Sequence, residues 1–85
     1  MATPRQLALL GQRIRKARAA KGWNQRQLAE AAKIDKAVIS RVESGSREPS
    51  LPTLHKLRDA LAIDDDTWVG WLDAIKPDTA SAAAS

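Results

Sequence analysis

Residues 24–43 read NQRQLAEAAKIDKAVISRVE, and this stretch decides the fold. Asn24 is a typical helix N-cap, and Gln27 stands three residues later, where a side chain reaches back to the cap. A tight turn is expected at Lys33–Ile34, and Asp35 can cap a second helix behind it. The inward faces of the two helices carry Leu28, Ala29, Ala32, Ile39 and Val42. The pattern predicts two short helices that pack closely around a small alanine.

Three further helices are expected outside this pair. Thr3 can cap a helix that starts at Pro4 and stops near Lys21–Gly22, since glycine commonly ends a helix. Ser50 can cap a fourth helix, and the acidic run 64–67 suits the start of a fifth. Apolar residues recur in these helices at helical spacing: Leu7, Leu10, Ile14 and Ala17; Leu51, Leu54, Leu57 and Leu61; Trp68, Trp71, Leu72 and Ile75. Because no segment alternates as a strand would, an all-α fold of five helices is predicted.

Charge is distributed unevenly along the chain. Residues 1–58 carry 13 Lys and Arg against four acidic residues, whereas residues 59–85 carry one lysine and six aspartates, for a net charge of +4. A basic body favours a polyanionic partner such as nucleic acid, although charge alone is equally compatible with a solvated surface. The chain has no cysteine and a single histidine, His55, so no disulfide, metal site or cofactor is expected. No apolar run is long enough for a membrane span.

Short motifs occur in a fixed order between residues 10 and 61. They are Ile14 with Arg18, Gly22-Trp23-Asn24-Gln25, Gln27-Leu28-Ala29, Ile39-Ser40-Arg41-Val42-Glu43-Ser44-Gly45, Arg47-Glu48-Pro49-Ser50-Leu51 and Thr53-Leu54. Together they resemble the lambda-repressor-like, Cro/Xre-type helix-turn-helix family. The resemblance implies a compact five-helix domain, usually dimeric, that binds operator DNA and most often represses transcription. It also implies a partly buried structural ion pair between Arg18 and Glu43.

One position departs from the family pattern. The turn between the two helices usually carries glycine, where this chain has Lys33. A left-handed turn at a residue with a side chain costs roughly 1 kcal/mol. We therefore expect a small local strain at Lys33 within an otherwise regular motif.

The free face of the second helix of the motif is the candidate reading surface. It is short, polar and basic, and arginine and lysine donate well to guanine O6 and N7. The predicted base-reading residues are Lys36, Ala37, Ser40 and Arg41. Contacts to the DNA backbone are predicted for Gln25, Arg26, Ser44, Ser46 and Arg47, because a helix N-terminus and a basic loop both hold phosphates. Val38 could touch a thymine methyl group or pack inward, and the sequence leaves both open.

One face of the fifth helix carries four large apolar side chains: Trp68, Trp71, Leu72 and Ile75. Trp71 and Ile75 are more than a domain of this size needs for its core, so an exposed apolar stripe is expected. Such a stripe marks an interface, and the four residues are predicted to hold a homodimer. The predicted domain is residues 1–76, with a dimerisation helix at about 64–76 and a disordered tail at 77–85. His55 is expected to be an ordinary surface residue.

The sequence bears on three classes of function: a DNA-binding repressor, a protein-binding module and an enzyme. The favoured class is a sequence-specific repressor that binds a near-palindromic operator as a homodimer, with its third helix in the major groove of double-stranded DNA. The alternative is an antitoxin or adaptor that uses the same fold to bind a protein, which the acidic fifth helix would suit. An enzyme is not expected, because no nucleophile–base pair or glycine-rich phosphate loop is present. No small-molecule ligand is expected either. The expected setting is a phage or plasmid circuit in the bacterial cytoplasm, at the nucleoid when bound to DNA.

Overall fold

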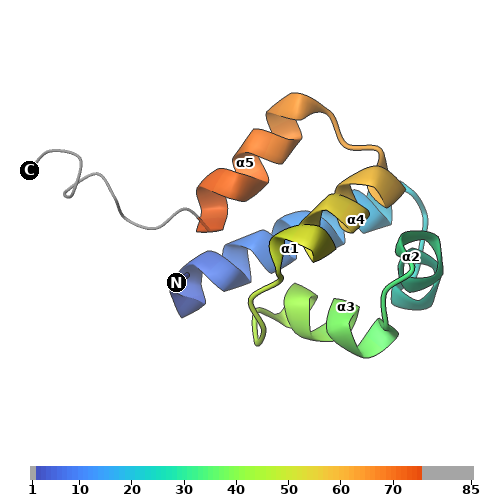
Figure 1. Cartoon of the computed structure of the whole chain (residues 1–85), viewed down its shortest axis with the longest axis horizontal. Helices are drawn as coiled ribbons and strands as arrows, with labels where there is room; N and C mark the ends of the chain where they lie inside the picture. The colour runs from blue at the N-terminus through green and yellow to red at the C-terminus, as the bar shows by residue number, and fades with distance from the viewer. Residues whose placement is uncertain (1, 76–85) are drawn as a thin grey trace, which may run out of the picture.

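Residues 2–75 are described by the structure, a computed structural model, and they form five α-helices without a strand. The helices are α1 (Pro4–Ala20), α2 (Gln25–Ala32), α3 (Lys36–Ser44), α4 (Leu51–Leu61) and α5 (Asp65–Ile75). In Figure 1, the long α1 runs through the middle of the molecule, with α5 on one side and α3 on the other. The predicted all-α class is confirmed, and within the described range no helix has the length and apolarity of a membrane span. The predicted tail at 77–85 lies outside the described residues.

Three of the helices begin with the predicted side-chain caps. The N–H of Gln6 donates to the hydroxyl of Thr3 at 3.1 Å, and the N–H of Thr3 donates to the side-chain oxygen of Gln6 at 2.8 Å. The same reciprocal pair joins Asn24 and Gln27, with both distances at 2.8 Å. At the start of α4, the Ser50 hydroxyl accepts a backbone N–H at 3.3 Å. Each cap satisfies N–H groups that the helix leaves unpaired and contributes about 1 kcal/mol.

Asp35 does not cap α3 in the predicted way. It occupies the N-cap position, but its side chain accepts no capping hydrogen bond. Its backbone lies at φ −59° and ψ 137°, whereas Thr3, Asn24 and Ser50 have ψ values of 160°, 176° and 161°. Because this backbone geometry differs from that of the capping residues, the prediction of a side-chain cap is wrong here, and the first turn of α3 lacks one.

The acidic run before α5 does supply a cap. Oδ1 of Asp64 accepts the backbone N–H of Thr67 at 2.7 Å. Hydrogen bonds from the side chain of Thr67 and then from its backbone N–H lower the pKa of Asp64 below its ordinary value. The ionised Asp64 carboxylate therefore stabilises the start of α5 at neutral pH. This stabilisation is lost as the pH falls through the lowered pKa.

Left-handed backbone conformations follow four of the helices, and the one after α1 is at Gly22, with φ 73°. Gly45 after α3 has φ 79°, which glycine adopts without a steric penalty. Lys33 after α2 has φ 58° and ψ 48°, so the predicted left-handed turn at a residue with a side chain is confirmed. Ala62 after α4 has φ 50°, and the sequence analysis did not predict this turn.

Lys33→Gly is expected to raise the free energy of unfolding by about 1 kcal/mol, because glycine adopts this φ without a Cβ clash. For a domain of this size that corresponds to about 4–8 °C in Tm, measured by circular dichroism. Glu30→Gly is the matched control: it lies within α2, where glycine costs about 1 kcal/mol. A Lys33→Gly protein that melts at or below the wild-type temperature would show that the turn is not strained.

The hydrophobic core takes buried side chains from all five helices: Leu10, Ile14, Leu28, Ala29, Ala32, Ile39, Val42, Leu54, Leu57, Leu61, Trp68, Trp71 and Ala74. Trp71 is 1% exposed and Trp68 is 8% exposed. The expectation that Trp71 is surplus to a single protomer is therefore wrong, because α5 packs back against α1 and buries this indole. Its Nε1 has no hydrogen-bond partner among the described residues.

Helices α1 and α3 approach each other closely at Gly11, which is buried. A Cβ placed there would overlap the carbonyl oxygen of Glu43 and would lie 2.7 Å from that of Val42. The close approach of the two backbones therefore requires glycine, which has no Cβ. The contact sets the position of α3 on α1, a role that the sequence analysis did not assign to Gly11.

Candidate nucleic-acid interface

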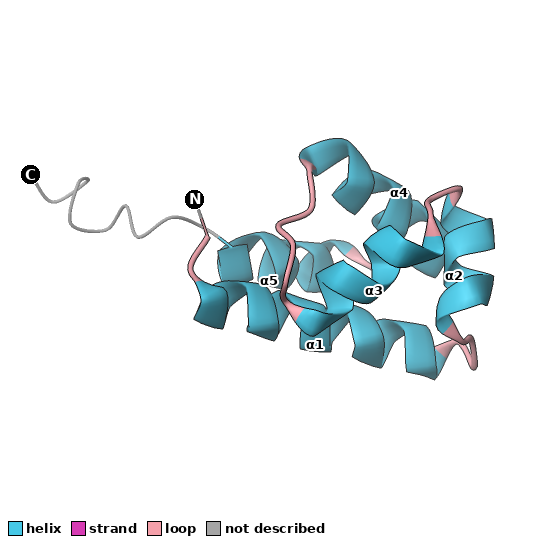
Figure 2. Cartoon of the chain, turned by 90° about the horizontal axis from the view of Figure 1, so that it is seen from below, coloured by secondary structure: helices cyan, strands magenta, loops and turns pink. Residues whose placement is uncertain are grey.

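Helices α2 and α3 form the predicted helix-turn-helix, with Lys33 at the turn between them. Figure 2, seen from below Figure 1, shows α3 at the front with α2 beside it. Ile39 and Val42 are buried and anchor α3 from its inner side. Val38 is half-buried and packs against the core, so the inward alternative describes its position.

The outward face of α3 is exposed and basic. All four predicted base-reading residues reach solvent: Lys36, Ala37, Ser40 and Arg41. Glu43 is the one acidic residue of α3, and it is 2% exposed because it faces α1. Within α3, this face carries two cations and no exposed carboxylate, which is the electrostatic pattern of a groove-reading helix.

The hydroxyls at the end of α3 are engaged within the protein. Ser44 Oγ donates to the carbonyl oxygen of Arg41 at 3.0 Å, and Ser46 Oγ lies 3.2 Å from the same oxygen. The two hydroxyls are 2.9 Å apart. Since a phosphate only accepts hydrogen bonds, a contact from Ser44 or Ser46 requires one hydroxyl to turn away from Arg41. Arg47, which follows in the loop and was also predicted to contact the DNA backbone, is exposed.

The start of α2 lies beside the start of α3. Arg26 and Lys36 line one shallow cleft with Arg18, Asn24 and Gln25, and its volume is about 550 Å³. Three of these five residues are cationic, so the cleft suits an anion such as a DNA phosphate. Lys36 thus combines an exposed place on α3 with proximity to the predicted phosphate contacts of α2.

A buried ion pair joins α1 to α3, as the resemblance implied. Arg18 donates from Nε to Oε2 of Glu43 at 2.7 Å and from Nη2 to Oε1 at 3.0 Å. The side chain of Glu43 is fully buried and that of Arg18 is 16% exposed. The hydrogen bond to Glu43 raises the pKa of Arg18 above its ordinary value. Arg18 also donates from Nη1 to the carbonyl oxygen of Trp23 at 2.8 Å, which ties the loop before α2 to the pair.

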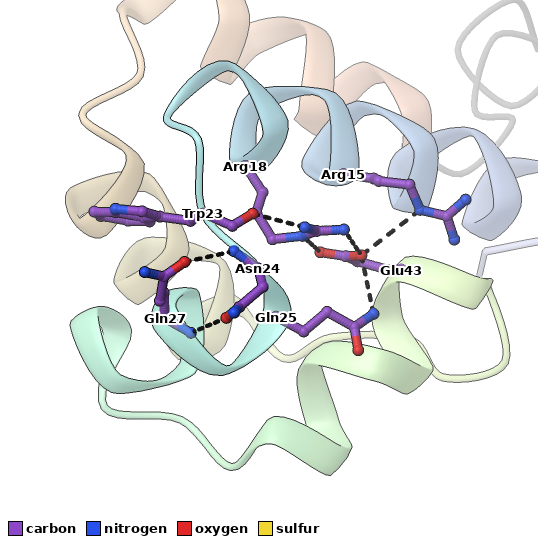
Figure 3. Close-up of polar contacts among 7 residues, drawn as sticks. All are labelled: Arg15, Arg18, Trp23, Asn24, Gln25, Gln27 and Glu43. Atoms are coloured by element: carbon purple, nitrogen blue, oxygen red, sulfur yellow. Dashed lines mark hydrogen bonds and ion pairs between the residues drawn. The ribbon is translucent and has the colours of Figure 1, made fainter.

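Two more side chains belong to this cluster, and Figure 3 shows them beside the carboxylate. Gln25 donates from Nε2 to Oε1 of Glu43 at 3.1 Å, and Nε of Arg15 lies 3.6 Å from the same oxygen. A phosphate contact is predicted for Gln25 from the sequence, but this bond is not, and no role is predicted for Arg15. The signal for Arg15 is its spacing, because residues three apart share a helix face and Arg18 follows it by three.

The predicted dimer-interface residues divide into two groups. Trp68 and Trp71 belong to the core, whereas Leu72 and Ile75 are half-buried at its edge. Val69, which the sequence analysis did not select, is 53% exposed on α5. His55 is exposed as expected, and its ring centre lies 5.0 Å from that of Trp68. The accessible apolar surface of α5 is therefore formed by Val69 with the edges of Leu72 and Ile75.

A protein-family model described as Helix-turn-helix matches residues 14–68. Two similar proteins come from Bacillus subtilis (strain 168). The SPbeta prophage-derived uncharacterized HTH-type transcriptional regulator YonR is 34% identical over 58 residues, which are 68% of this chain and 54% of YonR. The uncharacterized HTH-type transcriptional regulator YqaF is 35% identical over 51 residues, which are 60% of this chain and 67% of YqaF. The chain thus spans about half the length of the first relative.

Solved structures of restriction-modification controller proteins are similar as well. C.AhdI from Aeromonas hydrophila has a TM-score of 0.69 and 39% identity, over 73% of this chain and 94% of that one. Wild-type C.Esp1396I has a TM-score of 0.71 and 27% identity, over 82% of this chain and 92% of that one. The family match includes all of α2, α3 and α4. The chain therefore belongs to the Cro/Xre-type helix-turn-helix family, whose members are transcriptional regulators and not enzymes.

Proposed function

We propose that the protein is a transcriptional repressor that binds a near-palindromic operator as a homodimer, with α3 in the major groove. The observation that carries this proposal is the outward face of α3. It is exposed and basic, while Glu43, the one carboxylate of the helix, is buried and paired. Arg41 and Lys36 supply the donors that recognise guanine. None of the four base-reading residues belongs to the buried core, so all remain available to DNA.

The surroundings of α3 support contacts to the DNA backbone. Two predicted phosphate contacts, Gln25 and Arg26, lie at the start of α2. A third, Arg47, lies in the loop between α3 and α4. In this proposal they bind phosphates and thereby fix the register of α3 on the duplex. These phosphate contacts carry no sequence information themselves. Ser44 and Ser46 join them when a hydroxyl turns away from the Arg41 carbonyl. One reading helix covers few base pairs, so two copies about 34 Å apart would read successive major grooves.

The relatives support a regulatory role of this kind. YonR is a prophage-derived regulator, and C.AhdI and C.Esp1396I are restriction-modification controllers. We place this protein in a comparable phage or plasmid circuit, acting in the cytoplasm on nucleoid or plasmid DNA.

Arg41→Ala and Lys36→Ala are each expected to weaken binding to a selected operator by about 1–3 kcal/mol, with little change on random duplex DNA. Arg47→Ala should weaken both equally, because a phosphate contact does not depend on sequence. Fluorescence anisotropy at several salt concentrations measures both effects, and Lys16→Ala, which lies on α1 toward α5, is the control. An equal loss on both DNAs for Arg41→Ala would exclude it from base reading. If selection from random DNA yielded no duplex that the wild-type protein binds, the proposed function would be rejected.

Val69→Glu together with Leu72→Glu is expected to convert a homodimer into a monomer, because each carboxylate would have to leave water at the α5 interface. Trp71 is unsuitable for this test, because its indole is buried within the protomer. Sedimentation velocity at tens of micromolar measures the change. Leu51→Glu at the start of α4 is the matched control, since Leu51 is 55% exposed and lies outside α5. A monomeric wild type, or a double variant that stays dimeric, would count against the α5 interface.

A further inference from the structure

One oxygen of Glu43 is shared by three donor side chains. Oε1 lies 3.0 Å from Nη2 of Arg18, 3.1 Å from Nε2 of Gln25 and 3.6 Å from Nε of Arg15. Figure 3 shows Arg15 and Gln25 reaching this oxygen from α1 and from the start of α2. Because both contact one atom, their nitrogen atoms lie close to each other, beside the buried ion pair.

Arg15 and Gln25 retain donors that nothing in the described part of the chain uses. The amide of Gln25 has two N–H groups, and the carboxylate takes one of them. Arg15 approaches the carboxylate with Nε, so the N–H groups on its two terminal nitrogens stay available to another acceptor. The side chain of Arg15 is 55% exposed, whereas that of Glu43 is fully buried.

The cluster also has a surplus of positive charge. Arg15 and Arg18 bring two charges, and Glu43 compensates one of them. Since Arg18 is enclosed, the surplus lies on the exposed Arg15. The capping box of α2 leaves the backbone N–H groups of Gln25 and Arg26 unpaired, and these add the positive end of the helix dipole to the same region.

We propose that Glu43 is a positioning residue for DNA binding: it holds the Gln25 amide and the Arg15 guanidinium so that their free donors bind one backbone phosphate. This inference rests on the proposed DNA-binding function, and it gives Arg15 a contact that the sequence did not predict. Glu43 then has two tasks, as the charge partner of Arg18 and as the support of a phosphate contact beside α3.

Arg15→Met and Gln25→Met test the contact in the full chain with an operator duplex selected from random DNA. Arg15→Met should make the negative slope of log K against log salt shallower by about 0.9, because one phosphate is no longer neutralised. Gln25→Met should weaken binding several-fold on selected and random duplex alike and leave the slope unchanged. Lys16→Met, the matched control, removes the same charge one residue away on the side facing α5, and its slope should stay near the wild-type value.

Single methylphosphonates in the operator identify the phosphate. One position should weaken wild-type binding, weaken Arg15→Met and Gln25→Met less, and have no effect on the Arg15→Met/Gln25→Met double variant, because both partners are then missing. If Arg15→Met and Gln25→Met lost sensitivity to methylphosphonates at different operator positions, the proposal would be overturned. A wild-type salt slope for Arg15→Met would overturn it as well. A wild-type protein without salt-dependent DNA binding would overturn the proposed function instead.

Glu43→Gln separates positioning from stability, because it keeps the shape of the side chain and removes its charge. When circular dichroism shows the variant to be folded, it should be insensitive to the same methylphosphonate. A folded variant that keeps the sensitivity would show that Glu43 only stabilises the fold. If Glu43→Gln does not fold, Arg18→Met with Glu43→Gln is measured in the same way, since it leaves no unpaired charge buried.

Discussion

Glu43→Ala is expected to lower the free energy of unfolding by about 3–5 kcal/mol, because it leaves the enclosed guanidinium of Arg18 without its charge partner. Arg18 would keep only its bond to the Trp23 carbonyl. Small domains have total stabilities of about 5–15 kcal/mol, so this single change removes a large part of the whole. Urea unfolding followed by circular dichroism measures the loss.

An exposed carboxylate provides the control for this prediction. Glu30→Ala removes an exposed carboxylate from α2 and should change stability by no more than about 0.5 kcal/mol. Arg18→Ala should be as damaging as Glu43→Ala, and the double variant should lose less than the sum of the two. Wild-type stability in both single variants would mean that the pair is not buried in solution.

Gly11→Ala is expected to lower the free energy of unfolding by about 3 kcal/mol, the upper end of the usual range for overpacking. The added methyl would meet the backbone carbonyls of Val42 and Glu43, which cannot rotate away as a side chain could. Alanine gains about 1 kcal/mol over glycine in a helix, which is too little to offset this overlap. Thermal and urea unfolding would both report the loss.

Gly70→Ala on α5 is the matched control. A Cβ there would meet only Nη1 of Arg13, at 3.1 Å, and the end of a flexible side chain can move aside. Stability should therefore be unchanged or rise by up to about 1 kcal/mol through helix propensity. If Gly11→Ala behaved as Gly70→Ala does, the contact between α1 and α3 would be looser than the structure has it.

The sequence predicted those features that depend on neighbouring residues. The caps at Thr3, Asn24 and Ser50 are formed within four residues, so side-chain chemistry and spacing suffice to find them. The left-handed turn at Lys33 was predicted from the family pattern for the same short segment. Asp35 shows the limit of this reasoning, because a capping residue type does not cap unless its backbone adopts the required angles.

Features that depend on packing between distant segments were not predicted. Periodicity placed Trp71 on an apolar face, but it could not show that α1 covers that face. The need for glycine at position 11 comes from α3, whose carbonyls lie more than 30 residues further along the chain. Arg15 and Gln25 share one partner, Glu43, which is far from both along the chain.

The division of α3 into two faces has a consequence for how this protein can change during evolution. Its buried residues Ile39, Val42 and Glu43 hold the helix in place, while the four residues predicted to read bases are exposed and lie outside the core. Surface substitutions of this kind change stability by no more than about 0.5 kcal/mol. Under the proposed function, new operator preferences can therefore arise through single substitutions on the outer face without passing through unstable intermediates, and a duplicated gene can acquire its own target while keeping the same scaffold.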